Sequence, residues 1–340
     1  MEVVMNDKRT LGPWIKRFLL EYLPHERNLA CNTQKSYRDA LRLLVIFTAA
    51  KTHKMVDDLL VTDIDADVFR AFLRDIEEKR KCSISSRNQR LAAIHALASF
   101  IAECCPEHLE WCARLRSIRA KRSAPVPVCY LEKPEIDALL DTPCSTTEIG
   151  RRDRTLLLFL YNTGARADEA ANVCIDNLNL HRGADRSLSS VQLNGKGGKV
   201  RICPLWASTT QELTALIAGR DKKERVFLSR STQPLTRFGI YDIVTRHVRV
   251  AMKRLPNMQK KRIGPHTIRH TTATHLLRAG VDINTIRVWL GHVSIDTTNI
   301  YAETGLDMKA KALGMCEVKK AGRRKHWRDN SGLMSFLAQL

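Results

Sequence analysis

Residues 265–303 read PHTIRHTTATHLLRAGVDINTIRVWLGHVSIDTTNIYAE. His266 and Arg269 lie three residues apart at the beginning of this stretch. His292 follows 23 residues after Arg269, and Tyr301 comes nine residues later. Each has an ordinary explanation when taken alone, and a tyrosine in a helical pattern is usually a packing residue. Together they make this stretch the first candidate for a functional site.

The chain has 340 residues, enough for two domains with hydrophobic cores of their own. Lysine and arginine number 56 against 36 acidic residues, which gives a formal net charge of +20. So large an excess indicates a polyanionic partner, for which nucleic acid is the default. The alternative, a charge that serves only solubility, usually needs far less imbalance.

The ten cysteines include no CxxC pair. Their spacing is typical neither of a zinc site nor of a secreted disulfide framework, and it favours reduced thiols. No apolar run approaches the ~20 residues of a membrane span, and the first residues lack the apolar segment of a signal peptide. We therefore expect a cytoplasmic bacterial protein that associates with the nucleoid and not with a membrane.

Hydrophobic residues recur at helical spacing through the first third of the chain. They predict helices over residues 11–23, 32–50, 65–79 and 85–103. Asn32-Thr33 and Ser85-Ser86 are expected to cap the second and fourth of these helices. Residues 1–116 should therefore form an all-helical domain.

Two of these helices carry basic residues near their N-terminal ends: Lys35 and Arg38 in one, Arg87 and Arg90 in the other. A helix N-terminus favours phosphate through its N–H groups, and cationic side chains there suit contact with a DNA backbone. The alternative is that all four lie on solvated helix faces, the commoner place for lysine and arginine.

Residues 117–130 contain prolines and basic residues, which predict an extended, basic linker. Beyond it, an apolar helix is expected to end at Gly164, directly before Arg166. Residues 189–204 predict a β-hairpin with Lys196 in its turn. Its inward faces are expected to carry Val191 and Leu193 on one strand, Val200 and Ile202 on the other. The predicted fold class is mainly α with a small antiparallel β-sheet.

Several common sites fit these residues poorly. His266, His270 and His275 lack the glutamate of HExxH and any nearby acid, so no metal site is expected. Lys196 lies between glycines but lacks the first glycine and the Ser/Thr of a P-loop. No GxSxG motif is present, which argues against the usual serine hydrolase arrangement.

Two arginines, two histidines, one lysine and one tyrosine suit metal-free phosphoryl transfer instead. Arginine can bind two non-bridging phosphate oxygens at once and stays charged. A tyrosine with a pKa of about 10 becomes a nucleophile beside a base or cations, and lysine or histidine can protonate a departing 5′ oxygen. With the arginines stabilising the charge, neither a metal nor another cofactor is expected.

These residues and their spacings resemble the tyrosine recombinases, or phage-type integrases, including the Xer-like enzymes. The motifs that carry the resemblance are TGARADEAANV at 163–173 with Arg166, NGKGGKVRICPL at 194–205 with Lys196, HTIRHTTATHLL at 266–277 with His266 and Arg269, WLGH at 289–292 with His292, and Tyr301. The resemblance covers nearly the whole chain and says little about residues 306–340.

The resemblance implies the fold shared by tyrosine recombinases and type IB topoisomerases. An all-helical core-binding, SAM-like DNA-binding domain would span residues 1–116, and an α+β catalytic domain would span 131–305, with the linker 117–130 between them. Residues 306–340 would form a tail that packs either in cis or on a neighbouring protomer.

The resemblance also implies a role for each matching residue: Tyr301 attacks the scissile phosphate and forms a 3′-phosphotyrosyl link, Arg166 and Arg269 hold the non-bridging oxygens, Lys196 protonates the leaving 5′ oxygen, His266 assists the tyrosine's proton transfer, and His292 hydrogen-bonds the phosphate. Four copies on paired double-stranded sites would recombine DNA without ATP, with or without accessory proteins. Alternatives are a type IB-like topoisomerase and a DNA-binding protein that has lost the chemistry. The sequence does not distinguish integration, transposition, resolution or cassette capture.

Overall fold

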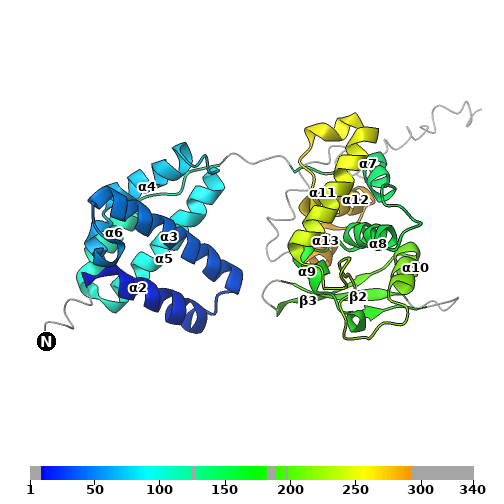
Figure 1. Cartoon of the computed structure of the whole chain (residues 1–340), viewed down its shortest axis with the longest axis horizontal. Coiled ribbons are helices and arrows are strands. Elements are labelled where there is room, and N and C mark those ends of the chain that lie inside the picture. The colour runs from blue at the N-terminus through cyan, green and yellow to red at the C-terminus, as the bar shows by residue number, and fades with distance from the viewer. Residues whose placement is uncertain (1–8, 124–127, 182–187, 196–197, 292–340) are drawn as a thin grey trace, which may run out of the picture. The chain divides into compact units, whose positions relative to one another are not determined.

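The computed structural model describes residues 9–123, 128–181, 188–195 and 198–291. The chain divides into two compact units, Met1–Val126 and Pro127–Leu340, which we call the N-terminal and C-terminal units. The division falls inside the segment predicted as a linker. Figure 1 shows helices in both units and a small sheet in the second. The predicted fold class, mainly α with a small antiparallel sheet, is confirmed.

The N-terminal unit is helical throughout its described part. Its elements are α2 (Leu11–Arg17), η1 (Phe18–Glu26), α3 (Cys31–Thr52), η2 (Val56–Asp58), η3 (Val61–Asp63), α4 (Ala66–Glu78), α5 (Ile84–Cys104), η4 (Pro106–His108) and α6 (Leu109–Arg116). The apolar stripes of these helices meet in one core. Aromatic rings pack at its centre, where Phe100 lies 5.6 Å from Phe18 and 4.6 Å from Tyr22 between ring centroids.

The two predicted helix caps lie two or three residues too late in the sequence, since the N-cap residues are Ala30 and Ser83. α3 begins at Cys31, so Asn32-Thr33 lie inside its first turn. α5 is capped by Ser83, whose hydroxyl oxygen accepts the N–H of Ser86 at 3.2 Å. A capping oxygen lies two or three residues before the N–H that it binds. The cap of α5 is therefore Ser83 and not the predicted Ser85-Ser86.

The first half of the predicted linker packs on the N-terminal unit. Ile118 is buried in its core. Lys121 forms an ion pair with Glu77, with 2.5 Å between Nζ and Oε2, and its carbonyl accepts the side-chain N–H of Asn88 at 2.8 Å. Residues 117–123 therefore extend the N-terminal unit beyond the end of α6.

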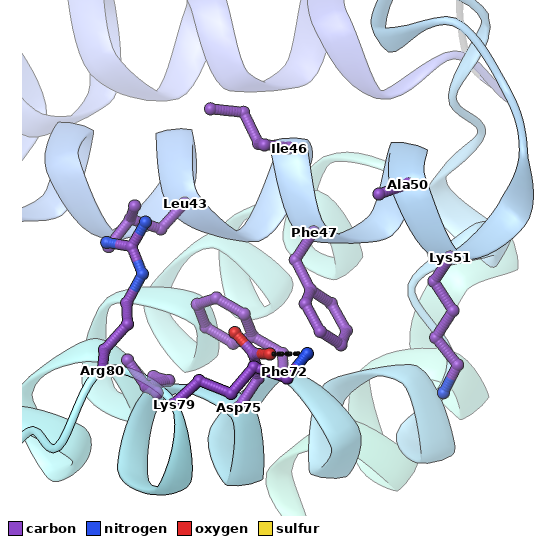
Figure 2. A pocket seen from close by; sticks show the side chains of 10 residues that line it. Leu43, Ile46, Phe47, Ala50, Lys51, Phe72, Asp75, Lys79 and Arg80 are labelled. Carbon is purple, nitrogen blue, oxygen red and sulfur yellow. Dashed lines mark ion pairs between the residues drawn. The ribbon is translucent and has the colours of Figure 1, made fainter.

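A groove of about 410 Å³ lies between α3 and α4 (Figure 2). Phe47 and Phe72 pack against each other in its wall, with ring centroids 5.6 Å apart. Lys79 and Asp75 form an ion pair at its rim, with 2.9 Å between Nζ and Oδ1. One side of α3 therefore lines this groove. Leu44, on another side of the same helix, is fully buried in the core.

The C-terminal unit combines helices with a small sheet. Its elements are α7 (Lys133–Leu140), α8 (Glu148–Thr163), α9 (Ala167–Asn172), η5 (Ile175–Asn177), β1 (Leu178–Asn179), β2 (Ser190–Asn194), β3 (Val200–Pro204), α10 (Ala207–Leu216), α11 (Arg237–Arg254), η7 (Pro256–Lys260), α12 (Pro265–Arg278) and α13 (Ile283–Leu290). The strands form an antiparallel sheet in the order β1-β2-β3. α8 is the central helix, since it packs against both α10 and α12 and contributes Phe159 and Leu160 to the core.

The strand β3 turns toward the core the face opposite to the one that the sequence predicted. Its register with β2 pairs Arg201 with the buried Leu193, so Arg201 points inward. Val200 and Ile202 point outward and are 57% and 69% exposed. A shift of one residue moves every side chain to the other face of a sheet. Hydrophobicity alone selected the wrong face, because Arg201 has a buried carboxylate as its partner.

No helix in the described ranges combines the length and the apolar character that crossing a membrane requires.

Candidate active site

Three of the six predicted catalytic residues lie in the described ranges, and all three belong to the C-terminal unit. They are Arg166, His266 and Arg269. Lys196, His292 and Tyr301 lie outside the described residues. The geometry below therefore concerns the part of the site that the two arginines and His266 form.

A sharp turn after α8 places Arg166 at the start of α9. Gly164 ends α8 in the left-handed conformation (φ 60°), as predicted. A Cβ at this position would lie 2.5 Å from Leu290 Cδ2, so glycine is required there for space as well as for φ. The chain then leaves the helix, and Arg166 becomes the N-cap residue of α9.

Glu169 holds Arg166 through two contacts. Its Oε1 accepts Arg166 Nη1 at 2.5 Å, and its Oε2 accepts the backbone N–H of Arg166 at 2.9 Å. The carboxylate is buried, whereas the Arg166 side chain keeps 31% of its surface exposed. The first predicted catalytic arginine is therefore held at its backbone N–H and at Nη1, while about a third of its side chain stays exposed.

Arg201 is the second partner of Glu169. Its Nη2 lies 2.7 Å from Glu169 Oε2, and both side chains are nearly inaccessible. Burial would raise the pKa of Glu169, but hydrogen bonds and positive charge from Arg201 and Arg166 outweigh it and lower the pKa to about 2. Glu169 is therefore ionised at any pH at which the protein would work. Arg201 was not among the predicted site residues, although its place in the NGKGGKVRICPL motif offered a signal.

Arg269, on α12, ties together the two turns nearest to Arg166. Its Nη1 donates to the Gly164 carbonyl at 2.6 Å, and its Nη2 donates to the Leu290 carbonyl at 2.5 Å. The residue is only 3% exposed. The second predicted catalytic arginine thus fixes the end of α8 and the end of α13 against α12.

His266 lies in the first turn of α12, on the same side as both arginines. Partial burial lowers its pKa, the charges of Arg269 and Arg166 lower it further, and Glu169 opposes them. An imidazole with a lowered pKa is neutral at neutral pH and can accept a proton. The three described candidates are therefore brought together, with a neutral histidine beside two cations.

Arg166 and His266 line one hollow of about 460 Å³. Basic and aromatic side chains that the sequence analysis did not single out complete its wall: Arg237, Phe238, Tyr241 and Arg262. The Arg237 guanidinium lies 4.7 Å from the centre of the exposed Phe238 ring. The KKR run at 260–262, just before the stretch that opens α12, was a signal for part of this wall.

A buried carboxylate pins α11, which contributes to this wall, to α8. Asp153 Oδ1 lies 2.7 Å from Arg152 Nε, and its Oδ2 lies 2.5 Å from Arg246 Nη2 and 3.0 Å from His247 Nε2. Burial would raise the pKa of Asp153, but His247 and the two arginines together lower it. α8 leads into Arg166 and α11 begins at Arg237, so this cluster sets the two walls of the hollow relative to each other.

The expectation that no metal takes part stays a prediction. Within the described ranges, His, Cys, Asp and Glu side chains do not gather in threes as a metal ion would require. His270, part of the discarded histidine cluster, has its pKa lowered to about 4 by burial and by the nearby charges of His266 and Arg269.

The four DNA-binding candidates of the N-terminal unit differ in their surroundings. Lys35 and Arg38 are exposed on α3, where Arg38 pairs with Asp39. Arg90 is half-buried on α5. The starts of these helices are joined by a hydrogen bond of 2.6 Å from Gln89 Nε2 to Ser36 Oγ, so the three cations belong to neighbouring helix ends.

Arg87 departs from the prediction of a surface contact. The residue is buried, its Nε lies 3.5 Å from Glu77 Oε1, and its Nη1 donates to the Arg119 carbonyl at 3.4 Å. Its place near the start of α5 suggested contact with DNA, but α4 and the segment after α6 cover this position. In this conformation Arg87 fastens α5 to its neighbours.

The sequence profile of the phage integrase family matches residues 130–305, and that of the phage integrase N-terminal SAM-like domain matches residues 15–103. The chain belongs to the phage integrase family. It is accordingly a tyrosine-type site-specific recombinase, an enzyme of DNA strand transfer.

Relatives match this integrase-family chain over most of its length. A protein designated integrase/recombinase y4rC, from Sinorhizobium fredii, is 35% identical over 338 residues, which are 99% of this chain and 100% of the relative. Tyrosine recombinase XerC of Pelobacter propionicus is 32% identical, over 86% of this chain and 91% of the relative.

Solved structures share the integrase-family fold at lower identity. The Tn1549 transposon integrase in complex with transposon right end DNA has a TM-score of 0.67 and 16% identity, over 89% of this chain and 99% of that chain. The XerH recombinase in its post-cleavage complex with a palindromic difH substrate has a TM-score of 0.63 and 20% identity, over 86% of this chain and 82% of that chain. At these identities the likeness concerns the fold.

Proposed function

We propose that this integrase-family chain cleaves and rejoins double-stranded DNA at paired recombination sites through Tyr301. The tyrosine oxygen forms a new bond to the scissile phosphorus, and the bond from phosphorus to the 5′ oxygen breaks. A 3′-phosphotyrosyl link results. It keeps the energy of the cleaved phosphodiester, so another 5′ hydroxyl can reverse the step without ATP.

The observation that carries this proposal is the position of Arg166 and His266 on one hollow, backed by Arg269. Arg166 is partly exposed and lines this hollow, and a guanidinium can donate several N–H groups at once, which suits the non-bridging oxygens of a phosphate. Arg269, which already holds two carbonyl groups, would reach the phosphate from beneath. His266 is neutral at neutral pH, so it suits the proton that leaves Tyr301.

The roles of Lys196 and His292 rest on their motifs. Lys196 would protonate the leaving 5′ oxygen, and His292 would donate a hydrogen bond to the phosphate. Lys196 gives up a proton to the leaving 5′ oxygen and regains one from the 5′ hydroxyl that rejoins the strand. A complete strand exchange therefore neither consumes nor releases protons.

DNA would contact both units. Lys35, Arg38 and Arg90 lie at the neighbouring ends of α3 and α5, where cations and helix N–H groups favour phosphate. Arg237 and Arg262 would extend the contact around the catalytic hollow. We leave Arg87 out of this set because it is buried and paired within the N-terminal unit.

Four copies on two sites would be required to exchange both pairs of strands, since each copy supplies one tyrosine. The protein would act in the bacterial cytoplasm, on nucleoid DNA. Its relatives include XerC and XerD recombinases and a transposon integrase, which favours resolution or transposition as the biological setting.

A covalent-trapping experiment tests the proposal. Duplexes that the wild-type chain selects from a randomised library are nicked at successive positions, so that cleavage releases a short strand that diffuses away. Wild type should form a protein–DNA adduct that survives denaturing electrophoresis on one of these duplexes. Tyr301→Phe should bind the same duplex and form no adduct. Binding by wild type without any adduct would contradict the proposal, and relaxation of one plasmid without strand exchange would point to a topoisomerase.

A further inference from the structure

We propose that Arg201 is a positioning residue of the recombination site: it neutralises Glu169, so that Arg166 stays available for the DNA phosphate, and it fixes the base of the hairpin against the end of α13. This inference rests on the proposed function, because it assigns Arg201 to the same site. Arg201 does not reach the surface, so its action passes through other residues.

The contacts of Arg201 span three separate segments. Its Nη2 binds Glu169 Oε2 on α9 at 2.7 Å, and its Nε donates to the Trp289 carbonyl on α13 at 2.8 Å. The residue itself lies on β3. The side chains of Arg201 and Glu169 are 7% and 3% exposed. An ion pair so well buried has a fixed geometry, since water cannot replace either partner.

Two glycines lie against this pair, and each directly precedes a predicted catalytic residue in the sequence. A Cβ added to Gly195 would lie 3.4 Å from Glu169 Oε1 and 3.7 Å from Arg201 Nη1. A Cβ added to Gly291 would lie 3.3 Å from Arg201 Cδ. Lys196 follows the first glycine and His292 follows the second. The backbone on both sides therefore packs directly on the Glu169–Arg201 pair.

The two oxygens of Glu169 divide their partners between the two arginines. Oε1 binds the side chain of Arg166 at 2.5 Å, whereas Oε2 binds Arg201 and the backbone N–H of Arg166. Without Arg201, the buried charge of Glu169 would be left, among the described residues, with Arg166 as its cationic side-chain partner. A buried charge without compensation is costly, so the carboxylate would draw the Arg166 guanidinium inward and away from a phosphate. Arg201 prevents this because its guanidinium pairs with Glu169 Oε2 and compensates the negative charge.

Alternative roles for Arg201 make different predictions. A residue that only fills space would affect stability, and its loss would not be corrected by removing the charge of Glu169. A residue that contacts DNA would affect affinity. A residue that balances Glu169 would affect the cleavage step, and neutralising both members of the pair would restore part of the rate.

The experiment measures single-turnover cleavage and DNA affinity of the full chain on the nicked duplex described above. The variants are Arg201→Gln, Arg201→Lys and the double variant Glu169→Gln with Arg201→Gln. Arg220→Gln is the matched control, because it breaks another arginine–glutamate ion pair of the same unit, with Glu224 (3.1 Å). Thermal unfolding and circular dichroism establish that each variant is folded.

Arg201→Gln should cleave on the order of 10²-fold more slowly, the loss expected when a reacting group is misplaced by about 1 Å, with unchanged DNA affinity. The double variant should cleave faster than Arg201→Gln, and Arg201→Lys should lie between wild type and Arg201→Gln. Arg220→Gln should cleave like wild type. A double variant no faster than Arg201→Gln, or a rate of Arg201→Gln equal to that of the control, would overturn the inference.

A pH series gives a second readout. In wild type, Glu169 stays ionised because the arginines hold its pKa at about 2. In Arg201→Gln the penalty of burial is less opposed, so the pKa of Glu169 rises. As the pH falls, more of Glu169 is protonated and releases Arg166, so the rate of Arg201→Gln relative to wild type should increase. A constant ratio at every pH would count against charge balance. If wild type itself forms no adduct, the proposed function fails and the pair is merely structural.

Discussion

The two units hold themselves together in different ways. Among the described residues, the buried charged side chains are Arg87 in the N-terminal unit and Glu135, Asp153, Glu169, Arg201 and Arg269 in the C-terminal unit. The N-terminal core is instead a cluster of aromatic and aliphatic side chains, such as Phe18 and Phe100. The C-terminal unit thus keeps charge in its interior, next to the residues predicted to act on DNA.

This difference indicates a division of work. Apolar packing is indifferent to charge, so the surface cations of the N-terminal unit can change DNA affinity without changing its stability. Buried ion pairs depend on every partner, because one unpaired charge destabilises its surroundings. Charge substitutions in the C-terminal unit should therefore affect stability or the rate of cleavage strongly. Substitutions in the two units test this difference.

Asp153→Ala should give the largest effect on stability. It removes the carboxylate that Arg152, Arg246 and His247 share, and breaking a buried network of this kind costs about 3–5 kcal/mol. Hydrogen exchange of peptides from α8 and α11 should accelerate, whereas peptides from α5 should keep their wild-type rates. Unchanged exchange in α8 and α11 would show that the network is not what joins these helices.

Arg166→Lys should give the largest effect on the rate. Lysine keeps the charge but cannot hold two phosphate oxygens in one plane, so single-turnover cleavage should fall about 10²–10³-fold, the loss typical of a preorganised donor. DNA affinity should be retained, since many other cations contribute to it. Near-normal cleavage by this variant would remove Arg166 from the phosphate clamp.

Lys35→Gln and Arg87→Gln should affect different properties of the N-terminal unit. The first should change DNA binding, and the second should change stability. Lys35 is exposed, so its loss should reduce the salt dependence of DNA binding by roughly one phosphate contact and leave stability within about 0.5 kcal/mol. Arg87 is buried against Glu77, so its loss should destabilise α5 by about 1–3 kcal/mol, as for an unsatisfied buried partner. Salt titrations of DNA binding and hydrogen exchange of α5 separate the two effects. An Arg87 variant that loses only affinity would restore it as a DNA contact.

His266 should give a modest pH dependence. Its pKa is lowered by burial and by Arg269 and Arg166, so the imidazole is neutral at neutral pH and gains a proton only as the pH falls below its usual range, about 6.5. If it accepts the proton of Tyr301, cleavage should slow as that protonation occurs. His266→Asn should lack this limb, so the rate advantage of wild type should shrink at acidic pH. An advantage that does not change with pH would argue for a purely structural histidine.

The sequence predicted the architecture well where a local pattern determines it. Gly164 ended α8 where a glycine follows an apolar helix, and Arg166 came next at the start of α9. The hairpin was also found, but its inward face was not. Hydrophobicity favoured Val200 and Ile202, whereas the carboxylate that makes Arg201 an interior residue comes from α9, 32 residues away.

The same limit applies to Arg87. On a single helix it looks like Arg90, and nothing local tells the two apart. Its burial depends on Glu77 of α4 and on the carbonyl of Arg119, which only the tertiary fold brings to it. Ion pairs between residues far apart in the sequence are therefore the feature that sequence patterns predicted least well. In this chain such an ion pair lies beside the predicted site.

The most direct measurement of the central claim is to identify the residue that becomes linked to DNA. Wild-type chain trapped on its nicked duplex would be digested with protease and nuclease, and the peptide that retains a nucleotide would be sequenced by mass spectrometry. We predict that the nucleotide is joined through its 3′ phosphate to Tyr301, within the peptide that follows His292. A nucleotide on any other residue, or an adduct that persists in Tyr301→Phe, would contradict the account.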